Sequence, residues 1–118
     1  MGKSSRLSPR VSKAVTDPAN ELWLSPVSIW EFLLLHRKGR LKIPEGFSTW
    51  ITRALTATAF KEAPLTFEVA QALATINLPH DDPADQFLAA SAKVFDLTLV
   101  TADEKLFAAP GIKVLANR

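Results

Sequence analysis

The chain contains no cysteine, no tyrosine and only two histidines among its 118 residues. Without cysteine it can form neither a disulfide nor a thiolate nucleophile nor a zinc–cysteine site. No apolar run approaches the roughly 18 residues of a membrane-spanning helix. The basic start MGKSSR is followed by no apolar segment typical of a secretory signal. We therefore expect a cytoplasmic protein with no membrane partner.

The composition is that of a globular protein, with 47% hydrophobic and 22% charged residues. At this length we expect one domain spanning residues 1–118. The formal charge of +2 is compatible with a phosphate-bearing partner but does not by itself indicate one. No GxSxG, P-loop or GxGxxG motif occurs, which removes several classes of enzyme.

The most informative stretch is residues 80–106, which reads as a helix, a strand and a turn. Asp82 is a suitable helix cap, and Pro83 fits the first helical position. The apolar run at 97–100 predicts a strand buried on both faces, and therefore a parallel one. Asp103 follows that strand, and Asp85 lies in the first turn of the preceding helix. A parallel sheet could bring both carboxylates to the edge where open α/β sheets bind ligands.

The rest of the chain completes an α/β pattern of helices and short strands. We expect helices at 8–15, 28–39, 46–58 and 66–76, and strands at 21–25, 63–65 and 112–115.

Three acids are candidates for a site, and each also has a purely structural explanation. Glu31 lies three residues after Ser28, as in a capping box, and Asp85 has the same spacing from Asp82. Asp103 could cap a short helical turn. Taken together, all three are predicted at helix starts or strand ends on one rim of the sheet. Clustered carboxylates repel one another, and a hard cation such as Mg²⁺ or Mn²⁺ relieves that repulsion.

Such a site would suit hydrolysis of a phosphodiester bond, in which the metal polarises the phosphoryl oxygen and activates water. His80 could lie beside the acids or only form a hydrogen bond in its loop. Thr101 could orient Asp103 or a phosphate, or simply end its strand. The basic residues at 37–42 could contact a phosphate backbone or be a solvated helix end.

Four segments in this order resemble PIN-domain proteins, and among them the VapC-type toxins of bacterial toxin–antitoxin pairs. They are LSPVSIWE at 24–31, KGRLKIP at 38–44, LPHDDPADQFLAASA at 78–92 and LTLVTADEKL at 97–106. The resemblance implies a metal-dependent endoribonuclease that cleaves RNA and is blocked by a cognate VapB-type antitoxin. It places Glu31, Asp85 and Asp103 in the acidic, metal-binding cluster, with His80 and Asp82 at positions beside it.

The chain departs from the family pattern at two places. Gln86 stands where such toxins usually have arginine, and MGKSSR stands where the family has an apolar strand that ends in a metal-binding aspartate. We therefore expect a PIN-like parallel sheet, flanked by helices, without that strand and its aspartate. Two strands would be left with unpaired backbone groups. The polypeptide would then be a weakly active or inactive ribonuclease.

Two other interpretations remain open. One is a non-catalytic module that binds an antitoxin, or itself as a homodimer, through the apolar helices around Trp30 and Trp50. The other is a generic α/β domain in which the acids serve only as helix caps.

Overall fold

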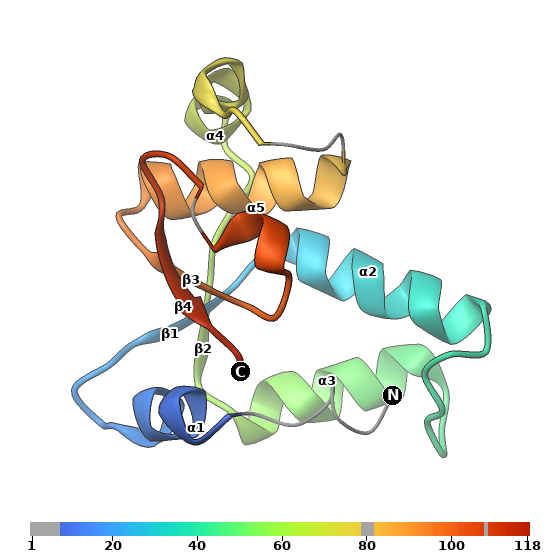
Figure 1. The fold of residues 1–118 in the computed structure, drawn as a ribbon. Coiled ribbons are helices and arrows are strands. Elements are labelled where there is room, and N and C mark those ends of the chain that lie inside the picture. Colours follow the sequence, from blue (N-terminus) through green and yellow to red (C-terminus); the bar gives the residue numbers. More distant parts are fainter. Residues whose placement is uncertain (1–7, 79–81, 108) are drawn as a thin grey trace.

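A computed structural model of the chain describes residues 8–78, 82–107 and 109–118. Its elements alternate as the sequence predicts, and Figure 1 shows the mixed α/β architecture. In chain order they are α1 (Pro9–Thr16), β1 (Leu22–Leu24), α2 (Pro26–Arg37), α3 (Phe47–Ala57), β2 (Phe60–Glu62), α4 (Phe67–Ala72), the 3-10 helix η1 (Leu73–Thr75), α5 (Pro83–Val94), β3 (Thr98–Thr101), the 3-10 helix η2 (Glu104–Leu106) and β4 (Lys113–Ala116). Among the described helices, none has the length and apolarity needed to cross a bilayer.

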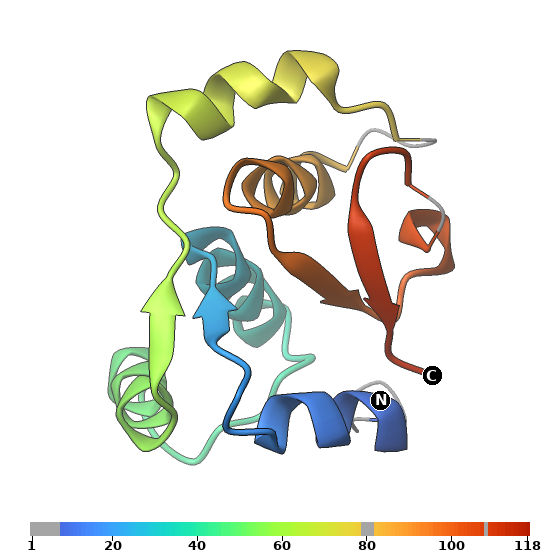
Figure 2. The ribbon, with the colours of Figure 1, turned by 90° about the vertical axis from the view of Figure 1, so that its left-hand side faces the viewer.

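The described strands form two separate parallel pairs. Strand β1 pairs with β2, with Trp23 opposite Lys61, and β3 pairs with β4, with Val100 opposite Leu115. No strand joins β1 to β3 among the described residues. In Figure 2 the arrows of β1 and β2 point upward, whereas those of β3 and β4 point downward. The expectation of parallel pairing is therefore confirmed, but the two pairs do not share one direction.

Polar side chains cap four of the α-helices, as the sequence predicts for three of them. Ser8, Thr66 and Asp82 each accept a hydrogen bond from a backbone N–H in the first turn that follows. The start of α2 was predicted wrongly, because Ser25 and not Ser28 is its cap. Pro26 then occupies the first helical position, where its missing N–H removes no hydrogen bond.

Helix α5 lies at the centre of the fold and packs against α4, α2 and β3. Its buried residues are all small, which lets neighbouring elements approach closely: Ala84, Ala89, Ala90, Ser91 and Ala92. Larger core side chains come from three other elements, namely Val11 of α1, Val69 of α4 and Leu106 of η2.

Several other boundaries differ from the predictions. Strand β2 lies three residues earlier than expected, because Ala63 only closes the ladder by donating its N–H to the carbonyl of Leu24 (2.9 Å). The helix expected at 66–76 divides into α4 and η1. Strand β3 is not buried on both faces, since its residues alternate between exposed and half-buried. It is half-solvated because only β4 pairs with it in the described part of the chain.

Candidate carboxylate site

Glu31 is not part of a helix cap. The hydroxyl of Ser25 accepts a hydrogen bond from the N–H of Val27 (3.1 Å), and the N–H of Ser28 bonds the carbonyl of Ser25 (3.0 Å). Because α2 begins at Pro26, Glu31 lies in its second turn, beyond the reach of a capping box. The capping-box interpretation of Glu31 is therefore wrong. A half-buried glutamate in this position needs another explanation.

Asp82 and Asp85 lie at the start of α5, which packs against α2. One carboxylate oxygen of Asp82 accepts a hydrogen bond from the N–H of Ala84 (3.0 Å), so Asp82 serves as the helix cap. Asp85 follows in the first turn, where a negative charge is favourable to the helix dipole. The structural explanation thus holds for Asp82, and it accounts for the position of Asp85 without excluding a second role.

The packing of α5 against α2 brings like charges together. Burial raises the pKa of Glu31 above its ordinary value, and the negative charges of Asp85 and then Asp82 raise it further. The structure therefore places Glu31 and Asp85 in one electrostatic environment, although they lie far apart in the sequence. Two carboxylates that repel in this way provide a site that a cation would stabilise.

Asp103 has local bonds of its own. Its carboxylate accepts a hydrogen bond from the N–H of Lys105 (3.0 Å), which makes it the cap of η2. Its own N–H donates to the hydroxyl of Thr101 (3.0 Å). Thr101 therefore orients the backbone of Asp103, which is one of the roles predicted for it.

The described residues do not gather all the predicted site residues into one cluster. Among them, no group of three or more His, Asp or Glu side chains could hold a metal ion. In Figure 2 the β3–β4 pair does not run in the direction of the β1–β2 pair, so the four strands do not end at a single edge. The joint role of Glu31, Asp85 and Asp103 stays a prediction, and His80 lies outside the described residues.

Glu31 and Asp85 have the oxygen donors that Mg²⁺ and Mn²⁺ prefer, and they carry the excess negative charge that a cation would neutralise. The pair therefore fits a divalent cation in chemistry and charge. In the described part of the chain it lacks the additional protein ligands of a complete site.

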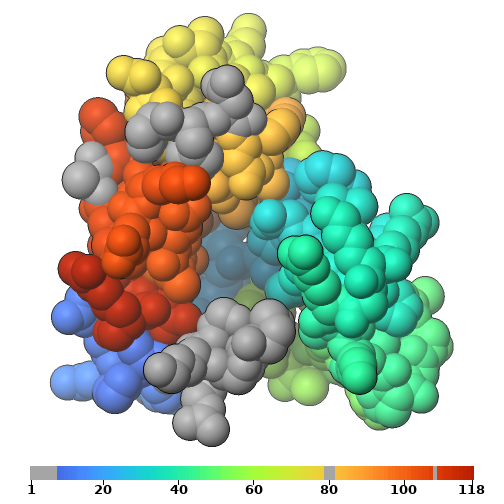
Figure 3. Space-filling view, turned by 45° about the vertical axis from the view of Figure 1, so that its right-hand side comes forward, coloured from blue at the N-terminus to red at the C-terminus, as the bar shows by residue number. Residues whose placement is uncertain are grey.

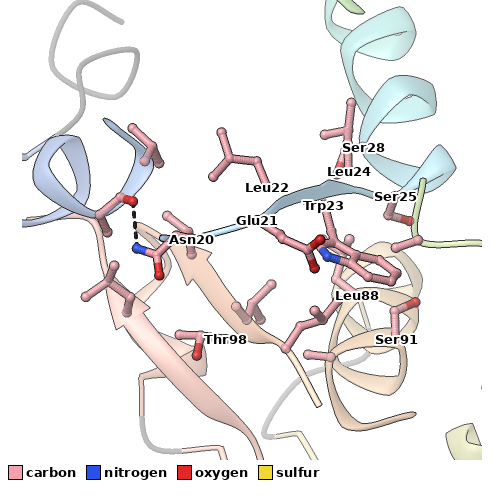
Figure 4. Close-up of a pocket in the computed structure, with 18 of the residues that line it drawn as sticks. Asn20, Glu21, Leu22, Trp23, Leu24, Ser25, Ser28, Leu88, Ser91 and Thr98 are labelled. Carbon is pink, nitrogen blue, oxygen red and sulfur yellow. Dashed lines mark hydrogen bonds between the residues drawn. The ribbon is translucent and has the colours of Figure 1, made fainter. Parts of the chain in front are cut away.

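The structure also contains a cleft that was not predicted from the sequence. The molecule is hollowed between the orange segment around η2 and the cyan helix α2 (Figure 3). A cleft of about 590 Å³ lies between β1 and β3, with α5 as one wall (Figure 4). None of Glu31, Asp85 and Asp103 lines it. The only sequence signal for this cleft is the expectation that two strands lack a partner.

Comparison with known proteins agrees with the architecture. A sequence model described as PIN domain matches residues 4–112, which is nearly the whole chain. Neither a curated protein nor a solved structure matches the chain. PIN domains are generally nucleases and typically use divalent metal ions. The matched residues include β1, β2, β3 and all the helices described here, and they end just before β4. The chain therefore belongs to the PIN domain family.

Proposed function

We propose that this protein is a metal-dependent endoribonuclease of the VapC type, with Glu31 and Asp85 at the centre of its site. One observation carries the proposal: the packing of α2 and α5 holds two carboxylates in one environment. The raised pKa of Glu31 shows that this arrangement disfavours the charged form of its side chain. Because Glu31 does not cap α2, helix capping does not explain why a carboxylate is held at this position. Membership in a family of nucleases supplies the reaction class.

The described residues support distinct roles. A bound Mg²⁺ or Mn²⁺ would supply polarisation of the phosphoryl oxygen and an activated water. Glu31 and Asp85 would hold that ion, and Asp82 would fix the start of α5 through its bond to Ala84. Asp103, oriented by Thr101, is the proposed third acid.

The basic residues that follow Glu31 are proposed to bind the RNA backbone. Arg37 ends α2, and Lys38, Arg40 and Lys42 follow it, and all four are exposed. Phosphate contacts by such side chains carry no sequence information but position the strand, and they weaken as salt rises. The RNA substrate would therefore lie along the C-terminal half of α2.

The test is cleavage of a fluorescently labelled single-stranded RNA in the presence of Mn²⁺. Glu31→Gln and Asp85→Asn keep the shape of each side chain and remove its charge. We expect each to lower the cleavage rate by about a hundredfold, in keeping with the loss of a group that holds charge at a reacting centre. Glu62→Gln, at an exposed position of β2, is the matched control. Equal cleavage by all four proteins would contradict the proposal.

The proposed toxin role implies two partners: a VapB-type antitoxin, and a second copy of the chain with which it forms a homodimer. Expression in bacteria should arrest growth, and co-expression of the antitoxin encoded beside the gene should relieve the arrest. Glu31→Gln should abolish the arrest without preventing antitoxin binding.

A second candidate function is a non-catalytic module that binds an antitoxin or a second copy of itself. Two observations favour it: the described residues lack a three-acid group, and large apolar side chains are exposed, with Phe67 at 91% and Trp30 at 49%. In that case binding would survive the loss of both carboxylates, and no RNA cleavage would be seen with any protein.

A further inference from the structure

We propose that Trp30 of α2 is a specificity-determining residue, and that one unpaired base of a single-stranded RNA substrate stacks on its indole ring. This role rests on the nuclease function proposed above, because it concerns how the RNA is held at that site. Trp30 directly precedes Glu31 in the chain and is 49% exposed. A base bound to this ring would lie next to the proposed cation site.

The three tryptophans of the chain differ in their surroundings. Trp23 packs against Phe95 with ring centroids 5.7 Å apart, and Trp50 packs against Phe32 with centroids 6.1 Å apart. Trp30 takes part in none of the ring contacts between described residues. Tryptophan buries a large apolar surface when a partner covers it, which is why it is enriched at binding surfaces. Of the three, Trp30 therefore has the ring that is accessible to a ligand.

The contacts of α2 show which side of the helix carries Trp30. Phe32 and His36 are one turn apart, and both contact aromatic rings of α3. Trp30 precedes Phe32 by two residues, so it lies about 160° away around the helix axis, on the side opposite α3. Glu31, whose pKa is raised by acids of α5, is about 100° from Trp30. The exposed ring thus lies on the solvent side of α2, adjoining the side that carries Glu31.

A positive charge lies on the same side of α2 as Trp30. Arg37 follows Trp30 by seven residues, which is nearly two turns, so the two positions differ by about 20° around the axis and about 10.5 Å along it. Arg37 is exposed, and none of the ion pairs between described residues uses it. An apolar protein surface over this side would bury that charge without a partner, which is costly. A ligand with both a flat ring and a negative charge fits both residues.

A single strand of RNA has these two properties. Proteins hold such strands by stacking bases on aromatic side chains and pairing phosphates with cationic ones. The exposed basic residues at 38, 40 and 42 continue from Arg37 and would follow the backbone away from the stacked base. Bases of a duplex are already stacked on one another, so Trp30 favours single-stranded over double-stranded substrates. Because every base has a flat face, preferences among the four bases should be modest.

The test measures binding of the full chain to a fluorescently labelled single-stranded RNA oligonucleotide by anisotropy, with EDTA present so that no cleavage occurs. Trp30→Leu keeps an apolar side chain and removes the ring, and it should raise the dissociation constant about tenfold. Trp30→Phe keeps a ring and should stay within about threefold of the wild-type chain. Phe67→Leu, the same kind of change at a 91% exposed position outside α2, is the control and should leave the affinity unchanged.

A second ligand separates stacking from a structural role of the ring. An oligomer of the same length in which every nucleotide lacks its base keeps the phosphates but offers nothing to stack. The wild-type chain and Trp30→Leu should bind this oligomer equally. If Trp30→Leu weakened binding of both ligands alike, or of neither, the base contact would be overturned. A loss of RNA binding that accompanied a change from dimer to monomer in sedimentation would also overturn it, because Trp30 would then belong to an interface between copies.

Cleavage in Mn²⁺ is measured separately, so the two proposals can fail independently. Metal-dependent cleavage that requires Glu31, together with RNA binding that does not depend on Trp30, would overturn the base contact and leave the nuclease proposal standing. The expected loss of binding in Trp30→Leu, without cleavage by the wild-type chain, would support the base contact and contradict the nuclease proposal.

Discussion

The carboxylates of Glu31 on α2 and Asp85 on α5 lie close enough for the charge of Asp85 to raise the pKa of Glu31. This contact between two helices is the structural basis of the proposed site. The small buried residues of α5 allow this helix to pack closely in the core. Because Ser25 is the cap of α2, Glu31 lies in the second turn and takes no part in capping.

The pH dependence of stability should carry the signature of Glu31. Because its pKa is raised in the folded protein, the folded state holds this proton more tightly than the unfolded chain does. The resulting contribution to stability is complete below the ordinary glutamate pKa of 4.5, and it is lost as pH rises through the higher folded-state value. Glu31→Gln should therefore raise the melting temperature at pH 7 and change it less at pH 4.

The measurement is a series of thermal melts between pH 4 and pH 7, with Glu62→Gln as the exposed control on β2. If Glu31→Gln lowers the melting temperature at pH 7, the carboxylate is stabilised by its surroundings, and the repulsion inferred here is absent.

The cap of α2 can be tested with a pair of serine variants. Ser25→Ala removes the acceptor for the N–H of Val27 and should cost about 1 kcal/mol of unfolding free energy. Ser28→Ala should change stability by less than about 0.5 kcal/mol, because Ser28 lies inside the helix. Urea denaturation of both variants gives the comparison. A larger loss for Ser28→Ala would restore the capping-box explanation of Glu31.

The 3-10 helix after β3 should be essential to the core. Leu106 is 1% exposed, so Leu106→Ala leaves a cavity and should cost about 2–5 kcal/mol. The same change at exposed Phe67 should be nearly neutral. Denaturant unfolding of both variants measures the difference. A small effect at Leu106 would mean that η2 is not firmly packed and that the position of Asp103 is not fixed by the core.

Local signals in the sequence located most of the elements. Proline after a polar cap marks the starts of α1 and α5, and Gly39, which adopts a positive φ of 74°, marks the end of α2. The same signal was present at Ser25–Pro26, but the Ser28–Glu31 spacing competed with it. Helix starts were therefore predictable wherever one cap candidate stood alone.

Long-range relationships were less accessible. The spacing of Asp85 and Asp103 suggested one sheet edge, but whether strand ends meet depends on the direction of each strand pair, which no local pattern encodes. The electrostatic interaction of Glu31 with Asp85 depends on how α5 packs on α2. Proximity of the two acids was expected from their predicted positions on one rim of the sheet and from the family resemblance, but neither specified this helix packing. To predict the cleft beside β1, one would need to know which strand edges lack a partner among the described residues.

The most direct test of the central claim is a thermal melt of the chain with and without millimolar Mn²⁺, run beside the double variant Glu31→Gln, Asp85→Asn. A ligand that binds only the folded state stabilises it, and an ion present at about ten times its dissociation constant adds about 1.4 kcal/mol, or about 6 °C. The account predicts that rise in the wild-type chain and its loss in the double variant. An equal response in both proteins, or none in the wild-type chain, would contradict a cation site at Glu31 and Asp85.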